Sequence, residues 1–548
     1  MTAAVIEQGV NGLVVPPYLE DEEWPSLGGQ VCDFIETYLV HGPGDLRGEP
    51  AVIDDETRAL IYRIYEVYPR KHPKAGRRRF RRVAISLRKG TAKTEKAAWI
   101  AAAELHPAGP VRCDGWDAKG EPVGVGVTDP YIPMVAYTEE QTEELAYGAL
   151  YVICGEGPLA DDFDIGLDRI MRIDGDGKAA ALANAPGARD GARTTFQHAD
   201  ETHRFVLKRL KDSHRTMLAN LPKRKAADPW SLETTTAPTP GEGSIAEETW
   251  EYAELIAQGK RKNPSLFFFH RQASAAHDLT TRKGIRAAVV EASGPAAEWS
   301  NIDAIVDQWD DPTTDKAFLE RVWLNRRVQS SRQVFDIELV RAARSPREQK
   351  WPARKTPIAI GFDGSRTNDA TGIVGTEIES GYQFVIGCWE RPETADDEWE
   401  VPGDEVDQSM ADAFERWKVV MAFCDPPYWE SYVDQWAGRW PKKVVRFYTS
   451  RLPKMAAEVA AYVTAWQAGE VSYDGDKRLL AHLGNARKRE LNMLNDQGER
   501  LYVMEKERKD SPLKIDLAMA ANLSWAARGK GVSDGALKKK TGGMRALY

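Results

Sequence analysis

Cysteine is scarce in this sequence of 548 residues, which holds five cysteines, at positions 32, 113, 154, 388 and 424. They are scattered, odd in number and without any Cys-x-x-Cys pair. Such spacing disfavours a zinc site and a disulfide framework. It is typical of proteins that work in a reducing cytoplasm.

Long apolar runs and excess positive charge are also missing. No stretch of about eighteen apolar residues occurs, so we expect no membrane span. The N-terminal sequence MTAAVIEQGVNGL lacks a basic region followed by an apolar core, so no signal peptide is expected. The net charge of -9 argues against a protein that coats nucleic acid indiscriminately. A local basic groove would still be sufficient for DNA contact.

Hydrophobic residues make up 42% of the chain and charged residues 29%, an ordinary globular composition. The length suggests about two to four domains. A stretch rich in Pro, Arg and Lys predicts a linker at residues 346–357. It would separate a domain of residues 1–345 from one of residues 358–530, followed by a flexible basic tail at 531–548.

Before the predicted linker, short apolar runs alternate with helical patterns. Residues 82–87 and 134–136 predict strands, and residues 94–104 predict a helix rich in good helix formers. The segment TEEQTEELAYGALYVI after the second strand is also helical in pattern. This alternation predicts an α/β fold with a mostly parallel sheet and helices on both faces.

After the predicted linker, the pattern favours a mixed sheet with flanking helices. Strands are predicted at residues 358–362, 371–377 and 418–424, and a helix at residues 514–526. The first two strands flank the turn SRTNDA, which indicates that they run antiparallel.

A strand-to-helix junction, SLRKGTAKTE, carries the first candidate site. Lys93 and Thr94 lie at the helix start, where backbone N–H groups and the helix dipole favour phosphate. A lysine there can reach terminal phosphates, and a hydroxyl can hold magnesium. The standard motif has glycine where Leu87 and Ala92 stand, so a basic loop before a helix is the alternative. The predicted phosphate loop includes Lys89, Gly90, Thr91, Ala92, Lys93 and Thr94.

Two further segments could complete a nucleotide site. Asp200 and Glu201 end the run TTFQHADETH, where an acid can orient magnesium and a glutamate can polarise the attacking water. A strand then ends in the hydroxyl-rich turn Thr234, Thr235 and Thr236, which could sense hydrolysis and move a helix. An acidic pair on a surface and an ordinary Ser/Thr turn are the alternatives. The order of the three segments favours the nucleotide site.

Three aspartates indicate a second site. Asp363 and Asp425 each end an apolar strand, and Asp516 lies on an apolar helix face. Buried carboxylates are costly unless they are paired or bound to metal, so these could hold two magnesium or manganese ions. Two metals can stabilise the attacking and leaving oxygens of a phosphodiester. The alternatives are turns at Asp363 and Asp425 and a solvent-facing position for Asp516.

These segments, in this order, resemble the motifs of the large terminase subunits of tailed double-stranded DNA bacteriophages. RRRFRRVAISLRKGTAKTE is similar to the family's strand and variant phosphate loop, QHADETHRF to its Asp-Glu motif, and ETTTAPTPGEGSIAEE to its coupling motif. IAIGFDGSRTNDATGIV and KIDLAMAANLSW are similar to the two ends of its nuclease domain. The resemblance covers roughly residues 50 to 530.

The resemblance implies an N-terminal P-loop ATPase of the ASCE type and a C-terminal RNase H-like nuclease. Arg88 corresponds to the family's loop arginine and would bind ATP with the phosphate loop and Asp200. Thr94 and Asp200 would hold magnesium, Glu201 would be the catalytic base, and Thr234 to Thr236 would couple hydrolysis to movement. In the nuclease, Asp363, Asp425 and Asp516 would be catalytic and would hold two Mg²⁺ or Mn²⁺ ions. The segment VIDDETRALIYRIYEVYP stands where an adenine-contacting glutamine motif is expected, but it contains no glutamine.

The same resemblance implies ATP-driven packaging of viral double-stranded DNA into the procapsid and metal-dependent cleavage of concatemeric DNA. The implied partners are double-stranded DNA, the portal protein, the small terminase subunit and further copies of this chain in a ring. The implied location is the host cytoplasm and, transiently, the procapsid portal, but not the mature virion or a membrane.

Two rival functions remain open. A helicase or repair-type ATPase–nuclease would share both sites, but it should show further helicase motifs after the coupling segment, and none occurs before the linker. A capsid-associated DNA-binding protein with an inactive ATPase site would explain the unusual phosphate loop. Two basic runs, residues 76–82 and Lys538 to Lys540, could contact DNA phosphates, although solvated surface is the more common role.

Overall fold

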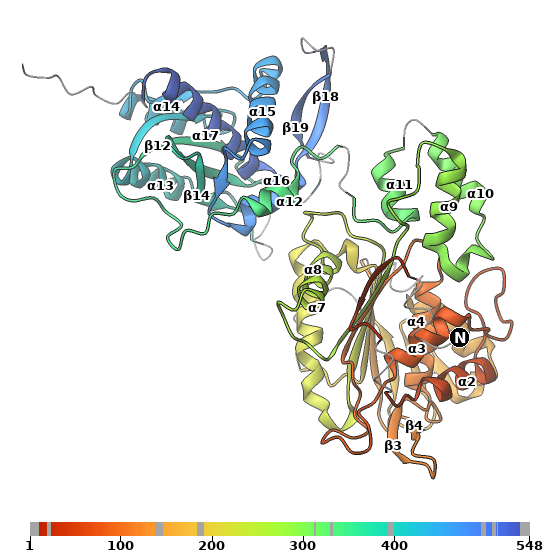
Figure 1. The fold of residues 1–548 in the computed structure, drawn as a ribbon. Coiled ribbons are helices and arrows are strands. Elements are labelled where there is room, and N and C mark those ends of the chain that lie inside the picture. The colour runs from red at the N-terminus through yellow and green to blue at the C-terminus, as the bar shows by residue number, and fades with distance from the viewer. Residues whose placement is uncertain are drawn as a thin grey trace, which may run out of the picture. The chain divides into compact units, whose positions relative to one another are not determined.

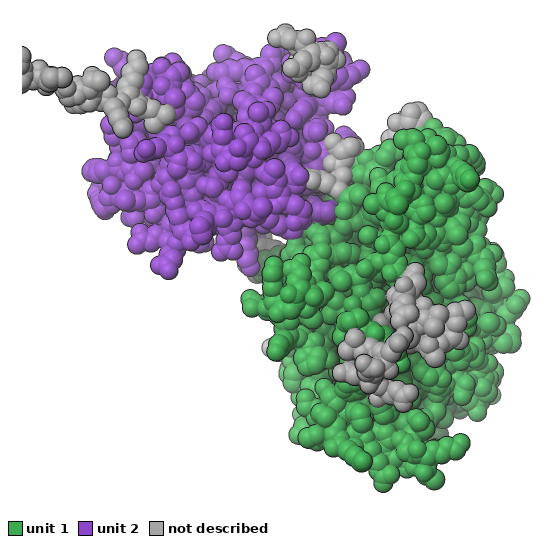
Figure 2. Space-filling view, in the orientation of Figure 1, with its two compact units in different colours: residues 1–239, 243–330 green, residues 240–242, 331–548 purple. Residues whose placement is uncertain are grey.

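The computed structural model of the chain describes residues 10–18, 24–137, 146–182, 191–311, 314–328, 332–367, 369–392, 399–494, 500–506, 511 and 513–536. They form two compact units, residues 1–239 with 243–330 and residues 240–242 with 331–548 (Figure 2). Residues 346–357, predicted as a linker, lie in the second unit after helix α12 (Ile337–Ala342). Within the described residues, no helix has the length and apolar character that a membrane crossing requires.

The first unit is built on a nine-stranded sheet with the order β1-β11-β2-β10-β9-β5-β8-β7-β6. The five neighbouring pairs from β11 to β8 are parallel, and the outer strands β1, β7 and β6 pair antiparallel. The strands are β1 (Gly12–Val15), β2 (Arg82–Ser86), β5 (Tyr131–Val135), β6 (Phe163–Ile165), β7 (Arg169–Arg172), β8 (Lys178–Ala181), β9 (Phe196–Asp200), β10 (Trp230–Thr235) and β11 (Leu266–Arg271). A separate hairpin joins β3 (Arg112–Trp116) to β4 (Pro122–Val125).

The order of the central strands positions the predicted nucleotide motifs. Strand β2 precedes the phosphate loop, β9 ends in the acidic pair, and β10, which ends in the threonine turn, lies between them. A strand inserted between these two motif strands is the defining feature of ASCE-type folds. Because the three strands are parallel, all three motifs leave the same edge of the sheet.

Helices cover both faces of this sheet, with α2, α3 and α4 on one face and α7 and α8 on the other (Figure 1). Helix α4 packs into the main hydrophobic core through an almost continuous run of buried residues from Ala97 to Leu105. The helices of this unit are α2 (Gly28–Tyr38), α3 (Asp55–Ile64), α4 (Lys93–Leu105), α6 (Gly148–Glu156), α7 (Lys208–Asn220), α8 (Ile245–Ala257), α9 (Arg282–Ser293), α10 (Ile302–Asp307) and α11 (Lys316–Trp323).

The second unit is built on a six-stranded sheet with the order β16-β15-β12-β13-β14-β17. Strands β12, β13 and β14 pair antiparallel, and β15 and β16 continue the sheet in parallel on the other side of β12. This is the strand arrangement of RNase H-like folds. The strands are β12 (Pro357–Gly364), β13 (Thr371–Glu377), β14 (Tyr382–Trp389), β15 (Lys418–Cys424), β16 (Val444–Arg446) and β17 (Ser472–Tyr473), with a separate hairpin of β18 (Arg487–Leu494) and β19 (Arg500–Glu505).

Two hydrophobic cores lie on opposite faces of this sheet. One contains Ile358, Ile360 and Phe362, and the other contains Ala359 of the same strand, as the two-residue period of a strand requires. The helices of the unit, besides α12, are α13 (Gly403–Arg416), α14 (Glu430–Arg439), α15 (Leu452–Gln467), α16 (Lys477–Asn485) and α17 (Asp516–Ser533). The predicted fold class, a mostly parallel α/β unit followed by a mixed-sheet α/β unit, is confirmed.

A glycine lets helix α17 lie directly on the central strand β12. A Cβ atom at Gly361 would stand 2.0 Å from the carbonyl oxygen of Ala520 and 2.3 Å from the backbone nitrogen of Ser524. Such distances are far below van der Waals contact, so only glycine fits. This close packing brings the N-terminus of α17 to the strand that carries Asp363.

Candidate active sites

The predicted phosphate loop connects β2 to α4. It contains a left-handed turn, although alanine stands where the standard motif has its second glycine. Gly90 has φ +76° and Ala92, immediately before the helix, has φ 54° and ψ 30°. Alanine thus adopts the conformation that glycine usually provides at this position. Thr91 fixes the turn by donating its hydroxyl to the carbonyl of Arg88 at 3.0 Å. The loop therefore ends, as predicted, with its backbone at the N-terminus of a helix.

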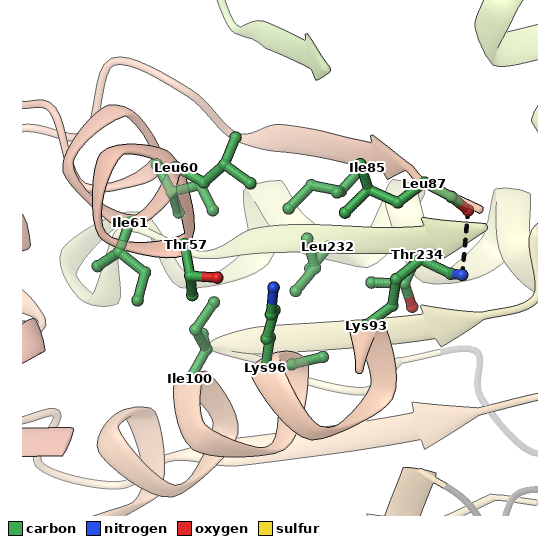
Figure 3. A pocket seen from close by; sticks show the side chains of 12 residues that line it. Thr57, Leu60, Ile61, Ile85, Leu87, Lys93, Lys96, Ile100, Leu232 and Thr234 are labelled. Carbon is green, nitrogen blue, oxygen red and sulfur yellow. Dashed lines mark hydrogen bonds between the residues drawn. The ribbon is translucent and has the colours of Figure 1, made fainter. Parts of the chain in front are cut away.

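The Lys93 side chain folds back over this loop. Its amine donates to the carbonyl oxygen of Leu87 at 3.1 Å (Figure 3). It also donates to the carbonyl oxygen of Arg88 at 2.9 Å. Burial lowers the pKa of Lys93 to about 8, while the carboxylates of Glu201 and Asp200 oppose that change. A buried ammonium with only carbonyl partners would gain from a polyphosphate, whose charge would favour the protonated form.

A small cavity of about 20 Å³ lies behind Lys93 (Figure 3). That volume holds about one water molecule. Its lining is mainly aliphatic and comes from α3, α4 and the neighbouring strands: Leu60, Ile61, Ile64, Ile85, Leu87, Ala97, Ile100 and Leu232, with Thr57, Lys93, Lys96 and Thr234. The segment at residues 52–69 therefore packs beside the phosphate loop, but this cavity is too small for an adenine ring.

Hydroxyl and carboxylate groups join the three predicted nucleotide motifs. Thr94 donates its hydroxyl to one carboxylate oxygen of Asp200 at 2.7 Å, and Thr234 donates to the other at 2.6 Å. His198, which lies on β9 with Asp200, has its Nε2 atom 2.7 Å from the Thr234 hydroxyl. The predicted magnesium-binding pair, Thr94 and Asp200, is thus already in contact, which is the arrangement that one ion between them would need.

Glu201 follows Asp200 with a left-handed backbone, φ 56° and ψ 42°. Burial and the neighbouring Asp200 carboxylate raise its pKa, and Lys93 opposes this rise. A carboxylate with a raised pKa is a better proton acceptor, which suits a catalytic base. His203, in the short helix η4 (Thr202–Arg204), lies 3.4 Å from Glu201 Oε2 and also contacts Thr235 and Thr236.

The Arg88 side chain is directed towards the end of α9 and the segment that follows it. Its side chain is 1% exposed and donates to the hydroxyls of Ser293 at 2.6 Å and Ser300 at 2.5 Å. It also donates to the carbonyl of Lys89 and lies over the Trp323 ring. Burial lowers its pKa to about 10. In this conformation Arg88 ties the loop to α9 and its following turn.

Most arginines of the basic run at residues 76–82 make contacts within the first unit. Arg78 is 3% exposed and lies over the rings of Tyr65 and Trp230. Arg79 pairs with Glu66 and Arg82 with Glu233. These contacts favour the structural alternative for most of the run. Lys538 to Lys540 lie outside the described residues.

The second site forms at the ends of β12 and β15. Asp363 is two residues after Gly361, so the strand period places both on the sheet face that α17 covers. Asp425 follows β15, which pairs with β12 in parallel, and its backbone nitrogen donates to the Phe362 carbonyl at 3.0 Å. Thr449 donates its hydroxyl to the Asp425 carboxylate. The two acids therefore leave adjacent strands side by side.

Asp516 completes the arrangement as the first residue of α17. It is 7% exposed, so its side chain is buried rather than on the solvent side. Its carboxylate accepts from the backbone nitrogen of Ala370 at 3.3 Å, in the turn after β12. His482 accepts from the backbone nitrogen of Leu517 at 2.9 Å and thereby caps the helix start.

The three acids influence one another's pKa values. Burial raises the pKa of Asp363 well above its usual value, and the charges of Asp516 and Asp425 raise it further. Burial also raises the pKa of Asp425 and of Asp516, opposed by the Thr449 hydroxyl and by His482 respectively. Like charges that raise one another's pKa are a destabilising arrangement that a divalent cation would relieve.

The chemistry of these donors fits magnesium or manganese, which prefer carboxylate oxygens. Within the described residues, however, no group of three His, Cys, Asp or Glu side chains is already arranged to hold an ion. The three aspartates are linked by the electrostatic interactions of Asp363 with Asp516 and Asp425.

Several residues beside the two sites were not predicted from the sequence. Asp369 accepts from Lys506 and from Lys514 beside the aspartate group. Fully buried Asn325 donates to the carbonyls of Ser86 at 3.0 Å and Arg271 at 2.8 Å, and it accepts from the backbone nitrogen of Ala237 at 2.7 Å. It thereby holds the ends of β2, β10 and β11 together. Neither the Asp369 contacts nor Asn325 belongs to a local sequence motif. Of the unpredicted residues, only His203 could have been found from the sequence, because it directly follows the Asp-Glu-Thr run.

Comparison with known proteins gives relatives with low identity. No protein-family model matches the sequence. Among curated sequences, the chain is 26% identical over 491 residues to the Gene 13 protein of Mycobacterium phage L5, covering 82% of this chain and 80% of that protein. It is 25% identical over 496 residues to the Gene 13 protein of Mycobacterium phage D29, with the same coverage.

Among solved structures, the chain is similar to the large terminase of bacteriophage HK97, at 15% identity and a TM-score of 0.48, covering 91% of this chain and 99% of that one. It is also similar to the large terminase of a thermophilic bacteriophage in complex with ADP, at 11% identity and a TM-score of 0.31 over 80% and 93% of the two chains. The magnesium-bound large terminase nuclease of thermophilic phage G20c matches 36% of this chain and 97% of its own, at 15% identity and a TM-score of 0.27. All three are large terminases. The present chain resembles that family in the order of its motifs and in the fold class of its two units.

The left-handed conformation of Ala92 leads to a testable prediction about the stability of the protein. A non-glycine residue in this region costs about 1–2 kcal/mol, and a new glycine also loses about 0.4–1 kcal/mol through the unfolded chain. We therefore expect Ala92→Gly to leave the free energy of unfolding unchanged or to raise it by up to about 1 kcal/mol. Denaturant unfolding of the two proteins measures the difference.

Ala101→Gly in the same helix is the matched control. Ala101 is fully buried in the interior of α4, where glycine costs about 1 kcal/mol in helix propensity alone. If Ala92→Gly destabilised the protein as much as Ala101→Gly, the left-handed strain at Ala92 would be disproved.

Proposed function

We propose that this chain is the large terminase subunit of a tailed bacteriophage, an ATP-driven motor for double-stranded DNA joined to a metal-dependent endonuclease. The observation that supports the proposal is that one chain holds, in separate units, two groups of residues whose chemistry suits phosphate reactions. The first combines a helix-terminal lysine loop with Asp200, Glu201 and Thr234, and the second combines three aspartates on an RNase H-like sheet.

The geometry of the first unit supports ATP hydrolysis. The phosphates would bind at the N-terminus of α4, where free backbone N–H groups and the helix dipole favour anions. Lys93 would exchange its contacts with the Leu87 and Arg88 carbonyls for phosphate oxygens. Thr94 and Asp200 would hold magnesium, and Glu201, with its raised pKa, would take a proton from the attacking water.

The geometry of the second unit supports phosphodiester hydrolysis. Asp363, Asp425 and Asp516 would hold two Mg²⁺ or Mn²⁺ ions, which would supply an activated water and stabilise the leaving oxygen. Asp363 lies at the end of β12 and experiences the charges of both Asp516 and Asp425, so it would take part in holding the ions. Thr449 and His482 hold Asp425 and the start of α17 in place before any ion binds.

The proposal includes the assembly in which such a subunit works. The chain would form a ring on the portal protein, receive DNA from the small terminase subunit in the host cytoplasm and leave before the virion matures. DNA-dependent filling of empty capsids by the purified chain would separate this function from that of a helicase or repair enzyme. ATP turnover alone would separate it from a capsid protein with an inactive site.

The first prediction of the proposal concerns ATP. Lys93→Ala should abolish ATP binding and turnover, because it removes the ammonium from the loop. Glu201→Gln should retain ATP binding but lower turnover by about a hundredfold or more, the usual contribution of a general base. Steady-state hydrolysis and equilibrium binding of a fluorescent ATP analogue measure the two effects.

Lys283→Ala provides the control, because Lys283 is exposed on α9. It should behave as the unaltered protein in both assays. Normal turnover in Lys93→Ala or in Glu201→Gln would refute the assigned roles.

The second prediction concerns the nuclease. Asp363→Asn should lower Mn²⁺-dependent plasmid cleavage by at least about a hundredfold, since outer partners of a metal site alone cost about 10–100-fold. ATP turnover should remain, because the nucleotide motifs lie in the other unit. Without metal, the variant should melt at a slightly higher temperature than the unaltered protein, because one of three repelling charges is gone.

Adding Mn²⁺ should raise the melting temperature of the unaltered protein more than that of Asp363→Asn. Asp412→Asn, an exposed change on α13, should keep both cleavage and the full metal-induced shift. Equal cleavage by Asp363→Asn and the unaltered protein would show that the catalytic acids lie elsewhere.

A further inference from the structure

The loop that follows β15 carries an exposed tyrosine beside the aspartate group. Tyr428 stands three residues after Asp425 and is 70% exposed. Its backbone is left-handed, with φ 66°. For a bulky side chain this conformation is an outlier, and outliers of this kind gather at functional sites. A tyrosine that costs backbone strain and faces solvent serves something other than the core of the protein.

Contacts on both sides of Tyr428 hold this conformation in place. Before it, the backbone nitrogen of Asp425 donates to the Phe362 carbonyl at 3.0 Å. After it, Trp429 is fully buried, and its ring centroid lies 5.4 Å from that of Phe362. The backbone nitrogen of Trp429 also donates to the Pro426 carbonyl at 2.7 Å. The loop is therefore anchored at both ends on β12, and the tyrosine ring between the anchors is held out in solvent.

Arg366, in the turn between β12 and β13, joins this loop to the strand end that carries Asp363. Its Nε atom donates to the Tyr428 carbonyl at 3.1 Å, and its guanidinium lies 4.6 Å from the centre of the Trp429 ring. Among the described residues, no carboxylate pairs with Arg366, and its two terminal nitrogens have no hydrogen-bond partner. Arg366 stands three residues after Asp363, as Tyr428 does after Asp425. Because β12 and β15 are parallel, both residues follow strands that end at the same edge of the sheet.

The chemistry of the two side chains matches the backbone of a nucleic acid. A guanidinium presents paired N–H donors that fit a phosphate, and Arg366 has such donors free beside a group of acids. A tyrosine ring can pack on the sugar or the base of a nucleotide without reading its sequence. A free cation and a free aromatic face therefore flank the proposed metal-binding acids.

We propose that Arg366 and Tyr428 form a substrate contact of the nuclease, in which Arg366 binds a phosphate next to the one that is cut and Tyr428 packs on a nucleotide of the same DNA strand. This inference rests on the proposed nuclease function and adds to it two residues that hold the DNA rather than the ions. Neither residue reads a base edge, so the contact is independent of sequence. The strain at Tyr428 is then the cost of presenting its ring to the substrate.

The variants separate charge, ring and strain. Arg366→Gln removes the charge and Arg366→Lys keeps it. Tyr428→Ala removes the ring and Tyr428→Phe keeps it, whereas Tyr428→Gly removes the ring and also relieves the left-handed backbone.

Arg354→Gln and Tyr151→Ala are the controls. The Arg354 side chain is 63% exposed and precedes β12, at the opposite end of that strand from Asp363. Tyr151 is an exposed tyrosine of α6 in the first unit. Loss of an exposed arginine or tyrosine as such should therefore appear in the controls as well.

The measurement is Mn²⁺-dependent cleavage of a short fluorescently labelled DNA duplex by the full chain without ATP, with kcat, KM and the salt dependence of kcat/KM. Arg366→Gln should raise KM and make the slope of log kcat/KM against log salt shallower by about one, the effect of one lost phosphate contact. Arg366→Lys should restore most of that slope. Tyr428→Ala and Tyr428→Gly should raise KM by about fivefold to a hundredfold with the slope unchanged, and Tyr428→Phe should remain near normal. Tyr428→Gly should melt at the same temperature as the unaltered protein or higher.

The outcomes separate this inference from the proposal on which it rests. No Mn²⁺-dependent cleavage by the unaltered protein would overturn the nuclease and the substrate contact together. Normal KM and salt slope in Arg366→Gln and Tyr428→Ala, with cleavage intact in the unaltered protein, would overturn the contact alone. So would losses confined to kcat, or losses of equal size in the two controls.

The melting temperature distinguishes a substrate contact from a structural role. A lower melting temperature with a normal KM in Tyr428→Gly would show that Tyr428 serves the fold and would overturn the contact. If Arg366→Gln melts below the assay temperature, the three Tyr428 variants test the contact by the same criteria, because their side chain is exposed.

Discussion

Repulsion between neighbouring carboxylates is a constraint that both units share. In the first unit, the charge of Asp200 helps to raise the pKa of Glu201, and the Lys93 ammonium is the cation that moderates it. In the second, Asp363 experiences the charges of both Asp516 and Asp425. Folding alone would select against such groups, because each could be replaced by a neutral side chain at lower cost. Under the proposed function, ligands that bring positive charge would explain their presence.

The sheets position these charges in the same way in both units. Adjacent parallel strands end at the same edge of a sheet. Asp200 and Thr234 therefore lie together at the ends of β9 and β10. Asp363 and Asp425 lie in the same way at the ends of β12 and β15. The remaining partner comes from a helix N-terminus, Thr94 in one unit and Asp516 in the other. A helix start favours anions, so it suits a phosphate in the first case and a carboxylate in the second.

The sequence predicted what depends on local pattern. Strands at residues 371–377 and 418–424 have the predicted bounds, and the predicted helix at 514–526 begins at Asp516 and extends to Ser533. Long-range partners could not be predicted, because no local pattern encodes them. Asp369 meets Lys506 and Lys514 from 137 and 145 residues away, and Arg88 meets serines more than 200 residues downstream.

Backbone strain is present at the proposed ATPase site. Ala92 and Glu201 both adopt left-handed conformations, and they flank the Thr94–Asp200 hydrogen bond along the chain. Such conformations cost about 1–3 kcal/mol each and persist only where the surroundings over-determine them. Here Thr91 holds the loop before Lys93, and the contacts of His203 with Thr235 hold the turn after Glu201. At this site, the strain lies in the two residues whose backbone would turn the proposed phosphate loop and the proposed catalytic base towards the same pair, Thr94 and Asp200. This is the arrangement expected of a site kept in shape before its ligand arrives.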